Sequence, residues 1–504
     1  MALLSVRNVL TGVSIVIAVL VAQIIVVKSC SHQTRAVVFR AQYILLMQLG
    51  MLAFSFILWR NFRDFPVHFS KFSCEVQSQS LTTRQKQRSS ASPGDDPGAS
   101  TESLFCRRNL HTSSDEHYTF SSSQNGSRSN VHNIWRLSLI LYLSLCHLSY
   151  FSNLFLIDKN PHWFGMLTYS CFGSFIQLNT GLLLFKTLSL IVKVWQNYVL
   201  KISSGGSHSS LLSVSVSGIH QKRIIGLLSL IYMILASTLG LYTASQPPGV
   251  ESVKIPVKDL PNNLYGLSIV QLSDIHLGPT VGLSKLQMIV DIVNKERPDV
   301  IVLTGDLVDG KAETLRGATQ PLKSLTSKYG KYFVTGNHEY YTGDVDNWFS
   351  LLRSVGFTVL HNSNVRIPAE LSENEDGQIC LAGTDDLQAD KIQYGEHRFD
   401  LAQALLSCST ALPVILLAHQ PKAARLAVDS KYRVDVVLSG HTHGGQLFPM
   451  MAGAYLLNPF YAGLYSVGDN RHVYVSRGTQ YWGIPMRIGT RMEITKITLV
   501  PTDD

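Results

Sequence analysis

Residues 267–276 read Leu-Ser-Ile-Val-Gln-Leu-Ser-Asp-Ile-His, a short apolar run followed at once by Asp274 and His276. Four later segments have the same form. They are Val300-Ile-Val-Leu303 before Gly305-Asp306-Leu307-Val308-Asp309, Tyr332-Phe-Val334 before Gly336-Asn337-His338-Glu339, Val414-Ile-Leu-Leu417 before Ala418-His419-Gln420, and Val434-Asp-Val-Val-Leu438 before Gly440-His441-Thr442-His443-Gly444. Such runs predict buried strands, and the carboxyl ends of neighbouring strands meet at one edge of an α/β sheet. We therefore expect these side chains to form one metal centre.

The mixture of ligand types indicates two metals. Two divalent cations about 3.5–4 Å apart can share a carboxylate and a hydroxide, and the hydroxide can then attack phosphorus in line. Imidazoles combined with carboxylate and amide oxygens favour Mn, Fe, Zn or Co over Mg, which prefers oxygen ligands alone. The pattern thus predicts two divalent cations in a hydrolytic centre.

The five blocks, in this order, resemble the calcineurin-like metallophosphoesterase superfamily, and within it the branch with membrane-anchored phosphoesterases. The resemblance covers roughly residues 266–498. It implies a metal-dependent phosphoric ester hydrolase. The predicted fold is an α/β metallophosphoesterase domain, 266–504, in which a two-sheet β-sandwich is flanked by helices. One of these helices is expected to follow the first block, over Leu283 to Glu296.

The resemblance also implies a role for each site residue. One metal would be held by Asp274, His276, Asp306 and His443, and the other by Asp306, Asn337, His419 and His441. His338 is left without a metal, so as imidazolium it would stabilise the transition state or protonate the leaving oxygen. An ordinary hydrogen-bonding His is the alternative at that position, and Asp309 is expected to be a hydrogen-bond partner. Met492 stands where the family commonly has Pro, so the resemblance does not predict the shape of the last loop.

The first half of the chain, 1–245, predicts a membrane region. Five stretches of about 20 mostly apolar residues have the length that crosses a bilayer core. They are 8–27, 41–59, 137–157, 163–185 and 224–242. The Ser-rich stretch 60–133 has too few aliphatic residues to bury a core, so we expect it to be disordered. Residues 246–265 are expected to be a linker.

Charge and cysteine content bear on the compartment. The net charge of +8 arises mainly from basic residues at span ends and in loops, so membrane topology explains it and no nucleic acid binding is expected. The positive-inside rule places the catalytic domain on the extracytoplasmic or lumenal side. Of the 7 Cys, Cys380 and Cys408 fall in the catalytic domain. They are expected to be buried thiols, or to form one disulfide if that domain is lumenal.

These features predict a membrane-anchored phosphoesterase that hydrolyses a phosphate ester or pyrophosphate bond. About 30 residues separate Tyr242 from Asp274, so the domain is held near the membrane lipids. The substrate is expected to be a phosphorylated small molecule or a lipid-linked phosphate. Two other classes remain open: a catalytically silent scaffold with the same fold, and a transporter or channel with a regulatory phosphoesterase domain.

Overall fold

A computed structural model describes residues 31–65, 122–203, 218–369, 377–468 and 470–502. The chain divides into two compact units. The sheet unit comprises 1–49, 146–174 and 235–504, and the helix unit comprises 50–145 and 175–234.

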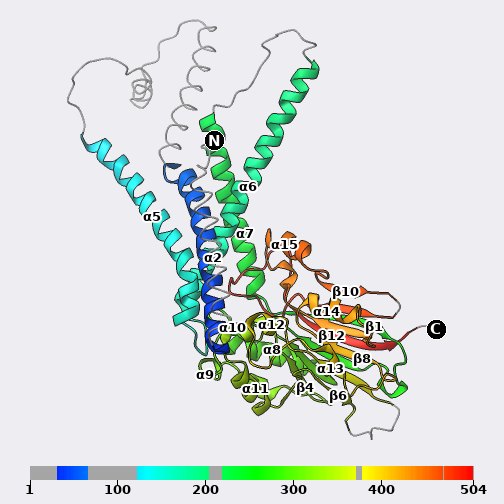
Figure 1. Ribbon diagram of the computed structural model, residues 1–504. Coiled ribbons are helices and arrows are strands. Elements are labelled where there is room, and N and C mark those ends of the chain that lie inside the picture. Colours follow the sequence, from blue (N-terminus) through cyan, green and yellow to red (C-terminus); the bar gives the residue numbers. More distant parts are fainter. Residues whose placement is uncertain (1–30, 66–121, 204–217, 370–376, 469, 503–504) are drawn as a thin grey trace. The chain divides into compact units, whose positions relative to one another are not determined.

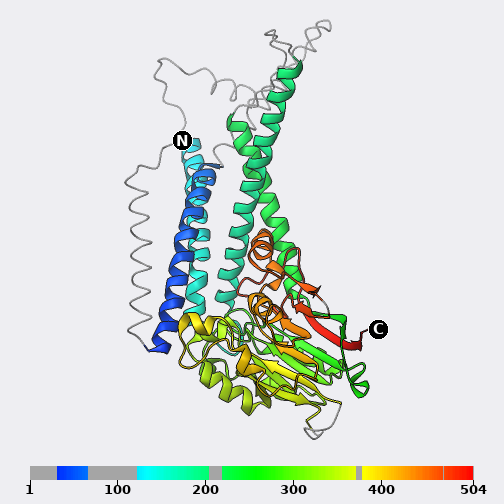
Figure 2. The ribbon, with the colours of Figure 1, turned by 45° about the vertical axis from the view of Figure 1, so that its right-hand side comes forward.

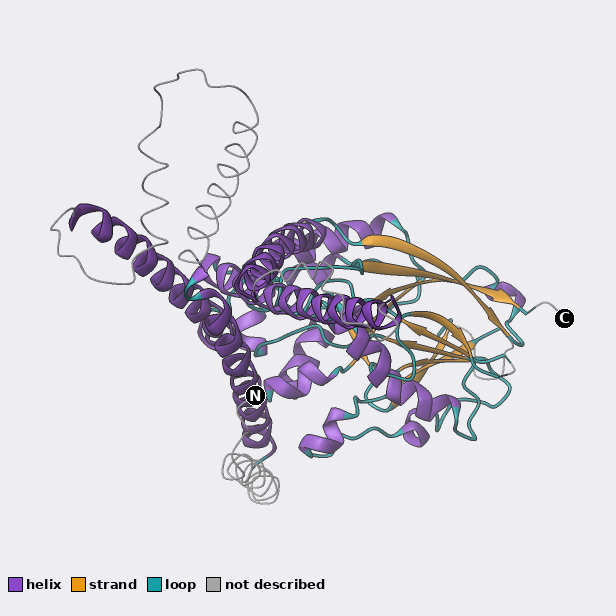
Figure 3. Ribbon diagram, turned by 90° about the horizontal axis from the view of Figure 1, so that it is seen from above, coloured by secondary structure: helices purple, strands orange, loops and turns teal. Residues whose placement is uncertain are grey.

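Twelve strands of the sheet unit form two mixed sheets of six strands each (Figures 1 and 3). The first sheet has the order β1-β12-β2-β3-β4-β5, with strands β1 (Gly249–Val257), β12 (Glu493–Pro501), β2 (Ser268–Leu272), β3 (Val300–Thr304), β4 (Lys331–Val334) and β5 (Phe357–Val359). The second has the order β10-β11-β9-β8-β7-β6, with strands β10 (Gly463–Ser466), β11 (His472–Val475), β9 (Val436–Ser439), β8 (Val414–Leu417), β7 (Ile379–Gly383) and β6 (Ser363–Ile367). Strands β2 to β5 are parallel, as are β7, β8, β9 and β11.

The two sheets pack face to face because their strands are apolar on both sides. In β3, Val300 and Val302 belong to a core shared with β8 and β9, while Ile301 and Leu303 face a second core on the outer side. This alternation follows from the two-residue period of a strand. The predicted two-sheet sandwich is confirmed.

Helices flank the sandwich. They are α8 (Leu283–Lys295), α9 (Ala312–Leu315), α10 (Asn337–Thr342), α11 (Val345–Ser354), α12 (Gln388–Ile392), α13 (Leu401–Ala404), α14 (Pro421–Val428) and α15 (Met450–Leu457), with short 3₁₀ turns η1 (Asn262–Leu264), η2 (Gln320–Ser324) and η3 (His443–Gly445). The predicted helix after the first block is α8. It buries Leu286, Ile289, Val290 and Val293 on one face.

Among the described residues, four helices are long and apolar enough to cross a membrane. They are α2 (His32–Phe62), α5 (Ser122–Phe155), α6 (Trp163–Ser203) and α7 (Gly218–Ser245). They contain the predicted spans 41–59, 137–157 (to Phe155), 163–185 and 224–242, and each extends beyond the span except where α5 ends two residues early. The predicted span 8–27 lies outside the described residues.

Two boundaries differ from the prediction. Residues 249–257, expected in the linker 246–265, form strand β1, which pairs in parallel with β12. Val253, Ile255 and Val257 alternate along it and pack into the inter-sheet core, which explains why this segment belongs to the sheet. The end of the Ser-rich stretch 60–133 is helical from Ser122, as the start of α5, and its residues 66–121 lie outside the described part.

Candidate metal centre

The predicted ligands converge at one edge of the sandwich. Asp274 and His276 follow β2, Asp306 follows β3, and Asn337 opens α10 after β4. His419 follows β8, and His441 with His443 follows β9. Because these parallel strands end at the same edge, residues separated by up to 169 positions become neighbours.

Two groups of side chains each bring their ligand atoms within 4.8 Å of one another. The first contains Asp274, His276 and His443, with His276 Nε2 only 3.0 Å from His443 Nε2. The second contains Asp306, His419 and His441. Asp306 also lies in a group with His276 and His338, and its Oδ2 is 3.2 Å from His419 Nε2 and 3.7 Å from His276 Nε2. Asp306 therefore lies between the two groups, as a bridging ligand must.

Asn337 completes the second group. Its Oδ1 lies 3.2 Å from His419 Nε2. The structure thus brings together all seven side chains that the sequence pattern predicts as ligands. Six of them are buried, and His441 is partly exposed.

The backbone at these residues is unusual. Asp274, His276, Asp306, His441 and His443 all have positive φ, between 51° and 72°. Residues other than Gly rarely adopt this left-handed backbone conformation, and those that do are concentrated at functional sites. At the strand ends it turns the side chains toward the common centre.

The donor set fits two divalent cations. Burial and the neighbouring charges of His276 and Arg487 hold the pKa of His443 well below its usual range, and burial with the charge of His419 lowers the pKa of His441 to about 3. Both rings are therefore neutral and present lone pairs. Imidazole nitrogens only 3.0 Å apart at the first group, with carboxylates beside them, match a site built around cations.

Comparison with known proteins gives the same result. A family model for calcineurin-like phosphoesterases matches residues 267–445. The chain is 46% identical to the transmembrane protein with metallophosphoesterase domain of Danio rerio over 365 residues, 72% of this chain and 80% of that protein. The chain belongs to the calcineurin-like metallophosphoesterase family. The Bos taurus protein of the same name is 45% identical over 370 residues, 73% of this chain and 80% of the relative.

A bacterial relative shows how far the likeness extends. An uncharacterized metallophosphoesterase of Aquifex aeolicus is 34% identical over 272 residues, which make up 53% of this chain and 98% of that protein. About half of this metallophosphoesterase is therefore similar to a whole bacterial family member. With four candidate spans among its described residues and relatives named as transmembrane proteins, the chain is a multi-pass membrane protein.

Three further side chains hold the centre in place. The Glu339 carboxylate accepts hydrogen bonds from the backbone N–H groups of Gly336, Asp306 and Leu307, at 2.6 to 2.9 Å. It thereby ties the loop after β3 to the start of α10. The Asp309 carboxylate accepts from Nδ1 of His276 and of His338, at 3.0 and 2.6 Å, which confirms the expected hydrogen-bond role of Asp309.

Arg487 is the third of these side chains and lies fully buried beside His443. Its guanidinium donates to the carbonyl oxygens of His443 and Arg477 at 2.6 and 2.8 Å. Sequence patterns gave no role to Glu339 or Arg487, because both act on backbone atoms that only the fold brings near.

His338 lies beside the ligands and faces the same space. Its backbone N–H donates to Asp306 Oδ1 at 2.8 Å, and its Nε2 is 4.0 Å from Asp306 Oδ2. Burial lowers the pKa of His338, but the charges of Asp306 and Asp309 outweigh it and raise that pKa to about 9. The ring is therefore an imidazolium at neutral pH. The Trp482 ring lies against it, with centroids 5.3 Å apart.

Residues around the centre contact the parts of α2, α6 and α7 that belong to the sheet unit. Gly483, next to Trp482, packs so closely on Tyr169 of α6 that a Cβ would lie 2.9 Å from Cε1 of that ring. Arg40 of α2 donates to the Asp309 carbonyl oxygen at 3.3 Å, and Arg487 N–H donates to the Gly240 carbonyl oxygen of α7 at 3.0 Å. The metal centre therefore lies next to the ends of three apolar helices.

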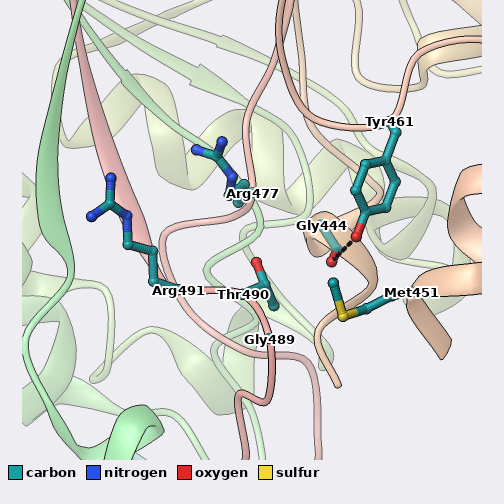
Figure 4. Close-up of a pocket in the computed structure, with 7 residues that line it drawn as sticks. All are labelled: Gly444, Met451, Tyr461, Arg477, Gly489, Thr490 and Arg491. Carbon is teal, nitrogen blue, oxygen red and sulfur yellow. Dashed lines mark hydrogen bonds between the residues drawn. The ribbon is translucent and has the colours of Figure 1, made fainter. Parts of the chain in front are cut away.

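A cavity of about 530 Å³ lies beside the centre, on the side of Gly444 (Figure 4). It is lined by Gly444, Met451, Tyr461, Arg477, Gly489, Thr490 and Arg491. Arg477 is paired with Glu493 at 2.6 Å and Arg491 with Glu251, so neither guanidinium brings an unbalanced positive charge to the cavity. Since this lining includes none of the predicted ligands, we do not place the reaction there.

Proposed function

We propose that this protein is a membrane-anchored phosphoesterase that hydrolyses a phosphate ester or pyrophosphate bond of a lipid-linked substrate. The observation that carries the proposal is the convergence of seven predicted ligand side chains, with Asp306 between the two groups, at a sheet edge that contacts apolar helices. Two divalent cations bound there would activate water and neutralise charge on the phosphoryl oxygens.

The chain's own residues would divide the work as follows. Asp306 supplies the carboxylate between the two groups and, through Oδ1, fixes the backbone of His338. Asp309 accepts the Nδ1 proton of His338, so Nε2–H is left to face the substrate. As water oxygen bonds to phosphorus and the bond to the leaving oxygen breaks, His338 donates its Nε2 proton to that oxygen.

The lipid-linked class is supported by helix α15. Its sequence, Met-Met-Ala-Gly-Ala-Tyr-Leu-Leu, is apolar, and it buries none of its residues. Tyr455, Leu456 and Leu457 are 66%, 79% and 72% exposed. So much exposed apolar surface on a short helix is unfavourable in water and typical of an interaction surface.

The position of α15 favours the bilayer as its partner. Phe448, just before α15, donates its N–H to the Ile488 carbonyl oxygen, and the Ile488 side chain contacts Gly240 near the end of α7. Figure 2 shows α15 beside this last part of α7. We infer that α15 enters the membrane interface and that lipid-linked substrates reach the metal centre from there.

We also propose that the sheet unit lies outside the cytosol. Basic residues near span ends favour this side by the positive-inside rule. Cys380 and Cys408 form a disulfide, a bond that persists in oxidising compartments. A glycosylation sequon placed on the exposed segment near Leu406 should be used in a secretory membrane, and a protein left unmodified there would refute this orientation.

The test of the function is hydrolysis by the purified full-length protein in detergent with Mn²⁺. The substrates are phosphomonoesters, phosphodiesters and lipid pyrophosphates, each with a water-soluble analogue. Metal-dependent hydrolysis of at least one lipid substrate is expected. Two tightly bound metals without any turnover would instead favour the silent scaffold, and ion flux through liposomes would favour the transporter.

A further inference from the structure

A second cluster of metal-binding side chains lies outside the centre described above. It consists of His361, Asp385 and His397, whose ligand atoms all lie within 4.8 Å of one another. His361 follows β5 of the first sheet, Asp385 follows β7 of the second, and His397 lies between α12 and α13. Sequence patterns do not reveal the cluster, because its members come from three segments without a shared motif.

The geometry resembles that of a three-ligand site. His361 Nδ1 lies 2.7 Å from Asp385 Oδ1, and His397 Nδ1 lies 3.7 Å from Asp385 Oδ2. The centroids of the His361 and His397 rings are 4.4 Å apart. Ligand atoms about 2.0–2.2 Å from a tetrahedral Zn²⁺ are separated by roughly 3.3–3.6 Å, so small rotations of these side chains would form the site.

The surroundings orient both partners of such a site. Asp346 Oδ1 is 3.5 Å from His397 Nε2, a carboxylate on the far nitrogen that directs the Nδ1 lone pair toward Asp385. The Tyr340 hydroxyl lies 3.2 Å from the same Nδ1, and it would release that nitrogen when a cation takes the lone pair. Asn362 holds the Asp385 loop by accepting its backbone N–H at 3.1 Å.

A plain ion pair explains less of this arrangement. One imidazole is enough to pair with Asp385, yet two rings turn Nδ1 toward the same carboxylate. Two imidazoles this close repel each other once both carry a proton, and a divalent cation between them uses both lone pairs. His361 is 37% exposed at its side chain, which leaves room for a water or other ligand at a fourth position.

We propose that His361, Asp385 and His397 form a third metal site that binds one divalent cation, with Zn²⁺ best suited to two imidazoles and a carboxylate. The site joins the end of β5 in one sheet to the end of β7 in the other. The sheets already touch here: a Cβ on Gly383 would lie 2.4 Å from Val334 and 2.6 Å from Leu360. Tyr340 of α10, the helix that begins with Asn337 and His338, lies beside the site.

This proposal is independent of the proposed function and is tested on metal content. The full-length protein in detergent is first made with His276→Ala, Asp306→Asn and His441→Ala, which remove ligands from both groups of the first centre. After loading with Zn²⁺ and dialysis, this parent should retain about one zinc per chain. Adding His397→Ala should remove it, whereas adding His472→Ala, a change at a buried His of β11, should not.

A second measurement covers variants that fold poorly. In the same parent, Zn²⁺ should raise the melting temperature and Co²⁺ should give the visible absorption of a tetrahedral site. The conservative change His361→Gln should abolish both signals. A parent that retains no zinc, or a His397→Ala or His361→Gln variant that keeps the parent's zinc content or melting shift, overturns the proposal.

Discussion

The edge of the sandwich with the candidate metal centre (the metal edge) and helix α15 lie in the same unit, but their side chains have opposite environments. At the edge, polar side chains such as Asp274 and His419 are almost fully buried and surrounded by protein partners. In α15, apolar side chains such as Leu456 are almost fully exposed. Burying a charge is costly unless it is paired or binds a metal, and exposing apolar surface is costly unless something covers it.

Both regions therefore indicate a partner that the chain does not itself supply. For the edge the partner that we propose is a pair of cations, and for α15 it is a bilayer. The two regions should therefore differ in the effects of mutation. Changes at the edge should affect hydrolysis of every substrate, whereas changes in α15 should affect substrates presented in a membrane.

The largest effect is expected from Asp306→Asn. This change removes the carboxylate between the two groups, so both metals should be lost together with activity, by about 10³-fold or more. Metal content and hydrolysis of a soluble phosphodiester, measured on one preparation, check it. A variant that keeps both metals and turns over would show that Asp306 does not bridge them.

His338→Ala should separate chemistry from metal binding. The ring donates to Asp309 and lies near Asp306, but the predicted ligand set is complete without it. We expect both metals to remain and kcat to fall by about 10²–10⁴-fold for soluble and lipid substrates alike. His472→Ala, at a buried His of β11, is the matched control. Normal turnover would make His338 a bystander, and loss of a metal would make it a ligand.

The sequence predicted the metal edge better than its surroundings, for a physical reason. Asp274, Asp306 and His443 stand directly after apolar runs, so local order alone places them at strand ends. Glu339, Arg487 and the cluster around Asp385 act through contacts between distant segments, and no local pattern records such contacts. Strand β1 was missed because its Pro-flanked sequence resembles a linker until β12 is there to pair with it.

The double change Leu456→Asp with Leu457→Asp tests α15. Each Leu removed from a lipid interface costs about 1.5–3 kcal/mol, so kcat/KM on a vesicle-embedded lipid substrate should fall by roughly tenfold or more. Hydrolysis of a soluble phosphodiester should stay unchanged. Leu406→Asp, at an equally exposed Leu of the sheet unit, is the matched control. Equal losses on both substrates would show that α15 supports the fold rather than the membrane contact.

The smallest expected effect is on the pH dependence of kcat, and it concerns His338 at the metal edge. His338 must be protonated to act as the acid, and the Asp306 and Asp309 carboxylates, acting against burial, raise its pKa to about 9. The protonated form therefore predominates below that pH and is lost above it, so kcat should be flat near neutral pH and fall as pH rises through about 9. This alkaline limb of the pH profile, the fall in kcat near pH 9, should be weaker for a nitrophenyl ester, because its leaving oxygen needs little protonation. It should be absent in His338→Gln. Because the acid belongs to the metal edge, the limb should lie at the same pH for soluble substrate and for lipid in uncharged vesicles. A limb that persists in His338→Gln would assign the proton to another group.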